Sequence, residues 1–366
     1  MTAILILITL TMTALLLWAR YPLRGRFTAA VYFLCFAAGL ILAGAASLAV
    51  LTLDTWTSWH LGMAATAANI ALTAGAAADL CLGTVRIFRR KAPAFPFRYN
   101  VLLTVFLCAA LLTFGTVNEK VSVARSCRVT SDRLSREYTV AFLSDIHYGD
   151  PSEPEKLSAD VAMINAAAPD LVILGGDITD DFSSKEEMEE AYAILSGLRG
   201  NTFFIFGNHD RQPHADLADG ARYTEEELIR TIEGSGITVL RDRAVRVGDD
   251  LILAGREDAS RAESRQAFRD IPGTDTDAFL LVADHSPYET DDLPDSGAIL
   301  QLSGHSHAGQ LFPNRLLMQL AGYRVYGDYK IGEAKLTVSS GEGVWHTPLR
   351  TEGRSEILFV TLAPAD

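Results

Sequence analysis

Residues 171–177 read LVILGGD, a run of four apolar residues that ends in two glycines and an aspartate. A short apolar run bounded by turn residues is typical of a strand that is buried on both faces of a sheet. Helix-period segments flank this run at 155–168 and 185–198, and further apolar runs lie at 138–145 and 202–210. Alternating strands and helices here, followed mostly by strands, predict a sheet-centred or layered α/β architecture.

Four more apolar runs end in Asp, Asn or His, as this one ends in Asp177. The carboxyl ends of parallel strands meet in one crevice where ligands bind, so we expect these side chains to lie close together. Each motif alone is typical of a turn or polar loop, and the prediction depends on the ordered set. The residues that close the four runs are Asp145 and His147, then Asn208, His209 and Asp210, then His285, and finally His305 and His307.

The chemistry of this set indicates a transition-metal site, because imidazole, carboxylate and amide oxygen are ligands of such ions. Thiolate ligands are excluded from the soluble part, because no cysteine follows Cys127. Seven candidate ligands are too many for one ion and suit two ions, about 3.5–4 Å apart, that share a carboxylate. Residues two apart in an extended segment share a face, so Asp145 and His147 can aim at one place. The predicted metal ligands are Asp145, His147, Asp177, Asn208, His285, His305 and His307.

These motifs, in this order, resemble those of the calcineurin-like metallophosphoesterase superfamily over roughly residues 138–362. The end of the chain, with GHSHAGQLFP, YGDYK and SSGEG, looks like the membrane-tethered bacterial branch of that superfamily. That branch usually shows Thr and Gly where this chain has Ser306 and Ala308. The motifs that carry the resemblance are DIH (145–147), GGD (175–177), GNHD (207–210), His285 and GHSH (304–307).

The resemblance implies a four-layer αββα sandwich and a role for each residue of the set. His209 would face the substrate, with Asp210 orienting it. The cofactors would be two divalent transition-metal ions, for which we favour Mn and leave Fe, Zn and Co open. One ion would be held by Asp145, His147, Asp177 and His307, and the other by Asp177, Asn208, His285 and His305, so that Asp177 bridges them.

Such a site predicts hydrolysis of a phosphate ester, phosphodiesters included, or of a pyrophosphate. Two cations lower the pKa of a shared water, so that a bridging hydroxide is available near neutral pH to attack phosphorus. The cations also offset the charge that develops on the phosphate oxygens, and His209 would protonate the leaving oxygen. The non-enzyme alternative is a binding module that has lost hydrolysis, but none of the predicted ligands is missing.

The first 118 residues contain four long apolar runs, each near or above the ~18 residues that a membrane-spanning helix needs. They predict a transmembrane domain of four helices over 1–118, a linker over 119–137 and a catalytic domain over 138–366. The four helices are expected at about 3–18, 29–53, 61–84 and 100–117.

Charge divides at the same place. Residues 1–118 hold eight Lys and Arg against two Asp and Glu, a net charge of +6, and the remainder carries −19. An acidic domain argues against a nucleic-acid partner, because neutralising phosphates requires a basic surface. A phosphate-bearing substrate stays compatible, because metal cations would supply positive charge. The second and third runs are rich in Ala and Gly, which suits close helix packing within one bundle or in a homo-oligomer.

The short loops predict the orientation in the membrane, because Lys and Arg are retained on the cytoplasmic side. The loops after the first and third runs are basic, whereas DTWTSWH (54–60) contains neither Lys nor Arg. We therefore expect an inner-membrane protein whose catalytic domain is extracytoplasmic. Lys120, Arg125 and Arg128 favour the opposite orientation.

A catalytic crevice close to the membrane surface favours a lipid-linked phosphate substrate. Some members of the branch that the chain resembles cleave a nucleotide-linked acyl-sugar lipid precursor, and this cytoplasmic pyrophosphatase reaction is the alternative. Asp79 in the third run is either a functional acid or an ion-pair partner of Arg86.

Overall fold

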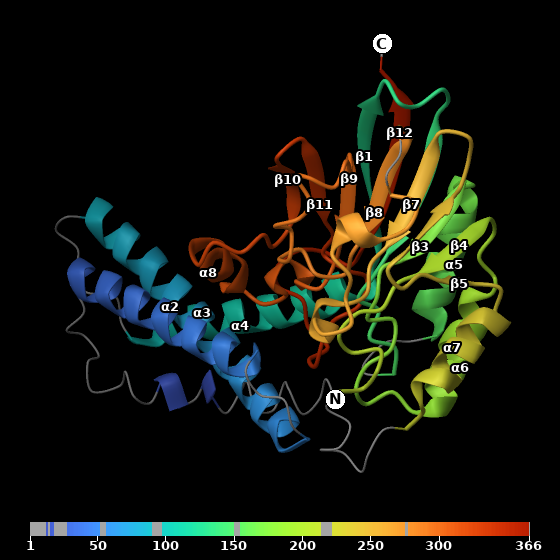
Figure 1. Ribbon diagram of the computed structural model, residues 1–366. Coiled ribbons are helices and arrows are strands. Elements are labelled where there is room, and N and C mark those ends of the chain that lie inside the picture. The colour runs from blue at the N-terminus through green and yellow to red at the C-terminus, as the bar shows by residue number, and fades with distance from the viewer. Residues whose placement is uncertain are drawn as a thin grey trace. The chain divides into compact units, whose positions relative to one another are not determined.

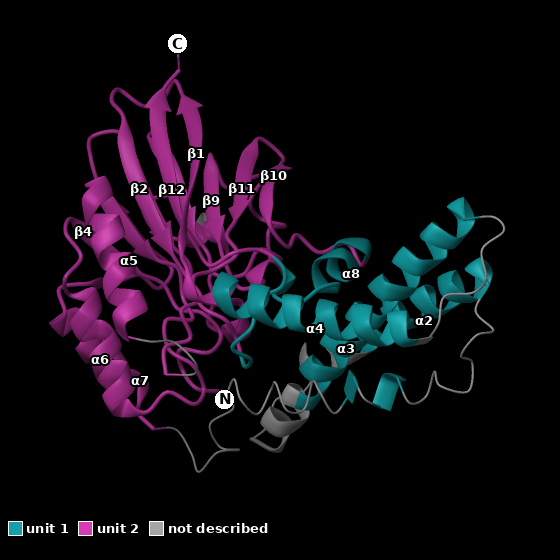
Figure 2. Cartoon of the chain, turned by 180° about the vertical axis from the view of Figure 1, so that it is seen from behind, with its two compact units in different colours: residues 1–118, 309–320, 346–352 teal, residues 119–308, 321–345, 353–366 magenta. Residues whose placement is uncertain are grey.

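The computed structural model describes residues 12–13, 15–17, 28–51, 56–89, 97–149, 154–213, 222–274 and 277–365. The chain divides into two compact units, which Figure 2 distinguishes by colour. Two loops from the C-terminal half of the sequence join the N-terminal helices in unit 1. Unit 1 comprises residues 1–118, 309–320 and 346–352, and unit 2 comprises residues 119–308, 321–345 and 353–366.

Unit 2 is built on two six-stranded sheets, and the first has the order β1-β12-β2-β3-β4-β5. Strands β2 to β5 are parallel to one another, and β12 lies antiparallel to β2. The predicted run at 171–174 is β3, and all four of its residues are buried. The bounds are Val123–Ser131 for β1, Tyr138–Leu143 for β2, Leu171–Leu174 for β3, Asn201–Phe204 for β4, Thr238–Val239 for β5 and Glu356–Pro364 for β12.

The second sheet has the order β10-β11-β9-β8-β7-β6. Its four inner strands are parallel, and the two edge strands, β10 and β6, are antiparallel to their neighbours. The carboxyl ends of β8 and β9 therefore lie at one edge of this sheet. The bounds are Arg243–Arg246 for β6, Leu251–Gly255 for β7, Phe279–Ala283 for β8, Leu300–Ser303 for β9, Gly327–Ile331 for β10 and Ala334–Val338 for β11.

The two sheets face each other across an apolar core, to which Phe142 and Ile173 contribute from one sheet and Leu253 and Leu281 from the other. A second core lies on the other face of the first sheet, beneath three helices that Figure 1 shows side by side. Burial on both faces explains why these strands read as continuous apolar runs. The helices are α5 (Pro154–Ala167), α6 (Lys185–Leu195) and α7 (Glu225–Gly234).

The outer face of the second sheet differs from the predicted αββα sandwich. A third apolar cluster joins Ile252 and Val282 of this sheet to Phe268 and Leu293. Among the described residues between β7 and β9, the only helices are the 3₁₀ segments η3 (Ala259–Arg261) and η4 (Phe268–Asp270). This segment is rich in Asp and Pro, which favour turns over α-helix. Unit 2 thus has a helical layer, two sheets and a covering of loops.

The segment 119–137 contains β1, where the sequence analysis expected a linker. This strand pairs in parallel with β12 at the edge of the first sheet, from Val123 opposite Glu356 to Ser131 opposite Pro364. Along most of β1, exposed residues alternate with half-buried ones. Its polar sequence, VARSCRVTS, lacks the apolar run of the inner strands, which explains why it was read as a linker.

Unit 1 contains α2 (Ala29–Leu51), α3 (Trp56–Phe88), α4 (Phe97–Lys120) and the short α8 (Asn314–Leu320). Two segments, Ala64–Phe88 and Arg98–Lys120, are long and apolar enough to cross a membrane. The four-helix membrane domain stays a prediction, and most of its first span (3–18) lies outside the described residues.

Polar groups tie unit 1 together internally. The Asn69 side chain on α3 donates hydrogen bonds to the carbonyl oxygens of Ala43, at 3.1 Å, and Phe312, at 2.8 Å. The loop 309–320 therefore binds directly to α2 and α3. Asp79, for which Arg86 was one expected partner, accepts a hydrogen bond from the Asn100 side chain at 2.9 Å.

Candidate metal centre

The residues predicted from the strand ends come together beyond the carboxyl ends of β2, β3, β4, β8 and β9. Each strand ends two to four residues before the first of its predicted side chains. Five of the seven predicted ligands have left-handed backbone conformations, with φ between 48° and 71°. The sequence analysis expected extended segments instead. Backbone strain of this kind is rare outside functional sites. The five residues are Asp145, His147, Asp177, His305 and His307.

Two glycines allow the loops to approach one another. A Cβ atom on Gly207 would lie 2.3 Å from Oδ1 of Asp177, and one on Gly304 would lie 2.1 Å from Oδ2 of Asp145. Any side chain at either position would therefore displace a carboxylate. Glycine has no side chain and therefore permits this close approach.

The first group of potential ligands consists of Asp145, His147 and His307, whose ligand atoms lie within 4.8 Å of one another. The Nε2 atoms of the two histidines are 3.1 Å apart. Nε2 of His307 lies 3.6 Å from Oδ1 of Asp145, and Nε2 of His147 lies 3.8 Å from Oδ2 of Asp177. Asp177 is therefore within reach of this group.

The second group consists of Asp177, His285 and His305, again within 4.8 Å. Nε2 of His285 lies 3.1 Å from Oδ2 of Asp177, the same oxygen that faces the first group. Asn208 joins this group, because its Oδ1 lies 2.8 Å from Nδ1 of His305. The seven predicted ligands thus lie in two neighbouring groups, with Asp177 between them.

Hydrogen bonds to the imidazole rings show that these residues fit cations. Nδ1 of His147 donates to Asp180 at 2.5 Å, and Nδ1 of His285 donates to the Gly175 carbonyl at 2.8 Å. The opposite nitrogen, Nε2, is then left as an acceptor in each ring. In His285 this nitrogen lies 3.1 Å from Oδ2 of Asp177, so that one cation could bind both atoms.

In the first group, the Asp145 side chain also indicates a cation site. Its Oδ2 atom is buried and accepts no hydrogen bond from the residues that the structure describes. Burying an unpaired carboxylate oxygen is costly, and a metal ion would satisfy it. The donor set of imidazole, carboxylate and amide oxygen, without thiolate, suits divalent transition metals.

His209 lies beside the first group without belonging to it. Its Nδ1 atom donates a hydrogen bond to Oδ2 of Asp181 at 2.5 Å, and its ring lies 5.3 Å from that of His147. Trp345 packs against the ring of His209, with 5.7 Å between the ring centroids. The imidazole therefore has a fixed orientation, with Nε2 as its remaining polar atom.

Asp210 does not orient His209, contrary to the family-based expectation. Its carboxylate instead accepts four backbone N–H groups, and its own side chain is fully buried. The carboxylate thus ties the loop after β3 to the loop after β4. The four donors are Gly207, Asp177, Ile178 and Thr179.

Electrostatic coupling within the cluster is strong. Burial disfavours the charged form of Asp177, but the nearby His285 and His209 hold its pKa well below the usual value. Burial likewise opposes the imidazolium of His209, yet the charge of Asp177 and the hydrogen bond to Asp181 raise its pKa to about 10. The site thus combines a strongly ionised Asp177 carboxylate with a His209 ring whose charged form is stabilised by nearby carboxylates.

Sequence reasoning missed Asp180 and Asp181, which orient His147 and His209 respectively. Both follow Asp177 in the stretch DITDD (177–181). Two acids directly after a strand-end ligand are a detectable signal. Only the folded loop reveals which imidazole each acid contacts.

Comparison with known proteins agrees with this geometry. The family model of the calcineurin-like phosphoesterases matches residues 138–309. The chain therefore carries a calcineurin-like phosphoesterase domain, and its relatives include proteins named metallophosphoesterases.

Relatives occur in bacteria and animals. The chain is 31% identical over 242 residues to an uncharacterized metallophosphoesterase of Helicobacter pylori, covering 64% of this chain and 62% of that protein. It is 29% identical over 290 residues to a Danio rerio protein named transmembrane protein with metallophosphoesterase domain, covering 74% and 64%. The chain thus spans just under two thirds of these relatives' lengths.

Among solved structures, the chain is similar to the protein TT1561 of Thermus thermophilus. The two are 14% identical with a TM-score of 0.38, over 56% of this chain and 89% of that one.

Proposed function

We propose that the protein is a membrane-anchored hydrolase that uses two divalent metal ions to cleave a phosphate ester or pyrophosphate in a lipid-linked substrate. The observation that carries this proposal is the pair of ligand groups on either side of Asp177. The proposed ligands are those predicted from the sequence, namely Asp145, His147, Asp177, Asn208, His285, His305 and His307.

When bound, two such ions supply an activated water and offset the negative charge that develops on the phosphate. The chain's own contribution is to fix both ligand groups and to place a proton donor beside them. Nε2 of His209 is suited to protonate the leaving oxygen, because Asp181 holds the other nitrogen. Trp345 packs on the same ring and limits its motion.

Features of unit 1 support attachment to a membrane. Besides the two apolar helices, α8 exposes Leu316, Leu317 and Leu320, of which Leu320 is 76% exposed. A Cβ on Gly44 of α2 would lie 2.9 Å from Leu317, so α8 packs on an apolar helix of the same unit. Exposed leucines beside apolar helices fit the boundary of a bilayer.

Chain connectivity supports a lipid-linked substrate. The loop that enters unit 1 at Gly309 begins two residues after the candidate ligand His307. A segment with exposed leucines thus follows directly from the proposed site. This arrangement favours a substrate whose phosphate group lies close to the membrane surface.

Hydrolysis by the full-length protein in detergent micelles tests the proposal. Phosphate monoester, diester and pyrophosphate lipids are offered with Mn, Zn, Fe and Co separately, and a His285→Ala variant is the matched control. We expect metal-dependent release of a phosphate product by the wild type, with far less from the variant. Absence of turnover with every lipid and every metal, alongside turnover of soluble phosphate esters, would reject the lipid substrate and keep the hydrolase.

The connection between α3 and α4 is rich in Lys and Arg, which are retained on the cytoplasmic side. Because α4 would then cross the membrane outward, this connection supports an extracytoplasmic catalytic domain. Reporter enzymes fused after Asp366, one active only in the cytoplasm and one only outside it, test this orientation. Activity of the cytoplasmic reporter would overturn it and favour a nucleotide-linked acyl-sugar lipid as the substrate.

A further inference from the structure

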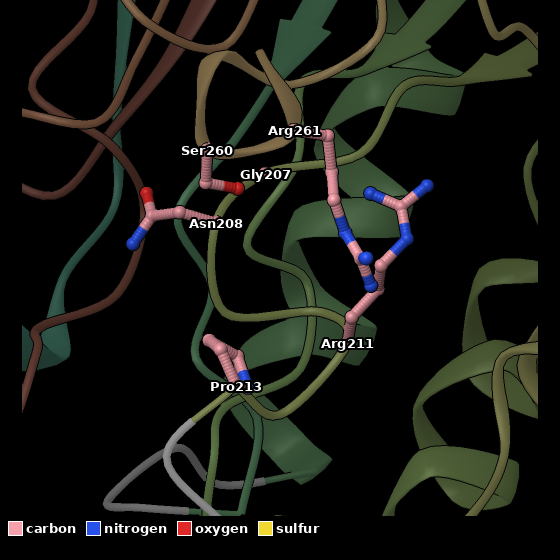
Figure 3. A pocket seen from close by; sticks show the side chains of 6 residues that line it. All are labelled: Gly207, Asn208, Arg211, Pro213, Ser260 and Arg261. Carbon is pink, nitrogen blue, oxygen red and sulfur yellow. The ribbon is translucent and has the colours of Figure 1, made fainter. Parts of the chain in front are cut away.

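A cavity of about 310 Å³ lies directly beside the proposed second metal position. Figure 3 shows Asn208 on one side of it and two arginines on the other. The Asn208 amide turns away from the arginines and contacts His305 of the metal-ligand cluster. One residue thus borders both the cavity and the cluster. The cavity is lined by Gly207, Asn208, Arg211, Pro213, Ser260 and Arg261.

The two arginines differ in how their charge is compensated. Arg211 donates to both oxygens of Glu257, at 2.8 and 3.0 Å, and to Glu225 at 3.0 Å. Its guanidinium also packs on the ring of Phe206, 3.6 Å from the centroid. Arg211 is therefore a structural residue whose charge is already neutralised.

Arg261 carries the uncompensated charge. It is exposed, and within the part of the chain that the structure describes its guanidinium has no hydrogen bond or ion pair. The neighbouring Ser260 is also exposed, and its hydroxyl has no partner among the described residues. Two free donors therefore border a cavity in a domain whose net charge is strongly negative.

Hydrogen bonds to neighbouring residues hold in place the loop that carries Ser260 and Arg261. The Asp258 side chain accepts the Ser260 amide at 2.8 Å and caps η3. Arg265 donates to the Glu257 carbonyl and to Asp284, both of which are buried. A fixed loop loses little conformational freedom when it binds a ligand, which strengthens recognition by Arg261.

We propose that Arg261 determines substrate specificity by binding a second anionic group, such as a phosphate or phosphodiester, next to the phosphate that is cleaved. Ser260 adds a hydroxyl donor to the same group. The cavity volume suits a compact charged group, and a free guanidinium is the donor that binds phosphate oxygens best. This inference depends on the proposed function for the position of the cleaved phosphate.

Competition against p-nitrophenyl phosphate hydrolysis tests the proposal in the full-length, Mn-loaded protein. The competitors are fructose 6-phosphate and fructose 1,6-bisphosphate, which differ by one phosphate. We expect the wild type to bind the bisphosphate about tenfold more tightly, as one charge-assisted hydrogen bond implies. Arg261→Gln removes this preference, and Arg261→Lys keeps part of it.

Arg243→Gln is the matched control, because Arg243 is an exposed arginine of the same unit that does not line the cavity. It should leave the preference unchanged. A wild type without preference, or an Arg261→Gln variant that retains it, overturns the inference. If p-nitrophenyl phosphate is not hydrolysed, calorimetric binding of the same two sugar phosphates decides the role of Arg261, and the lipid assay decides the proposed hydrolase separately.

Discussion

Nδ1 of His209 lies 2.5 Å from Oδ2 of Asp181, a residue that follows the central carboxylate, Asp177, by four positions. The next acid along the chain from His209, Asp210, contacts backbone amides instead. Orientation of the candidate proton donor therefore comes from the loop after β3, although His209 itself follows β4. The different roles of Asp181 and Asp210 can be measured.

We expect Asp181→Ala to lower kcat by about ten- to a hundredfold, less than the ~10²–10⁴-fold that general acid–base catalysis contributes, because His209 itself remains. Loss of the carboxylate removes both the charge beside His209 and the hydrogen bond that fixes its ring. Asp181→Asn should have a smaller effect, because its carbonyl oxygen still accepts the Nδ1–H. The measurement is kcat at saturating substrate together with metal content per chain. A loss of metal in either variant would place Asp181 among the ligands.

Asp210→Asn should act on stability and metal binding rather than on proton transfer. An amide offers one acceptor oxygen in place of two, and its N–H₂ group then faces backbone N–H donors. Leaving buried donors unpaired costs about 1–3 kcal/mol each. We expect a thermal midpoint several degrees below that of the wild type, at about 2–4 °C per kcal/mol for a domain of this size. An unchanged midpoint with a reduced kcat would return Asp210 to the orienting role.

Asp177→Asn should nearly abolish turnover, because the same oxygen faces both ligand groups. A neutral amide at this position weakens both ions together. Metal analysis of the purified variant should find fewer than one ion per chain, against two in the wild type. Near-normal activity of a variant reloaded with metal would disprove the bridging role.

His305→Ala and His307→Ala should each remove a different ion, because the two rings belong to different ligand groups. Each variant is expected to retain about one metal ion per chain. Anomalous scattering from Mn-loaded crystals distinguishes the two positions. If both variants lose the ion from the same position, the assignment of these two histidines is wrong.

A buried acid cluster around Asp160 predicts a pH dependence of stability. Burial and the adjacent Glu342 carboxylate raise the pKa of Asp160 to about 9, and Ser122 donates a hydrogen bond to it at 3.0 Å. Lys156 pairs with Glu342 at 2.7 Å and lies 4.0 Å from Glu119.

The folded state therefore retains a proton on Asp160 that the unfolded chain releases near pH 4. Because the folded pKa is raised, this contribution to stability is complete below pH 4 and is lost as the pH rises to about 9. Asp160→Asn mimics the protonated acid, so its thermal midpoint should exceed that of the wild type by a margin that grows across this range. A margin independent of pH would show that Asp160 does not titrate there.

Much of the candidate site could be read from the sequence because each of its loops follows an apolar strand. The run at 171–174 predicted a buried strand, and the polar residue after it predicted a place at the carboxyl edge of a parallel sheet. The edge strand β1 was not predicted, because a half-exposed strand carries a polar sequence without an apolar run. The predicted outer helical layer is absent from the described residues. That prediction came from the family resemblance and not from the residues of 256–298.

What the sequence determined by itself is which side chains converge, since strand direction and the residue at each strand end are local properties. What only the tertiary structure decided is how they pair. Asp210 is adjacent to His209 in the sequence and Asp181 is 28 residues away, but only Asp181 reaches its ring. Likewise, the sequence does not distinguish Arg211 from Arg261, but of these two arginines only Arg211 forms ion pairs with described residues, namely Glu225 and Glu257. Such choices depend on distances between loops from different strands, which no local pattern encodes.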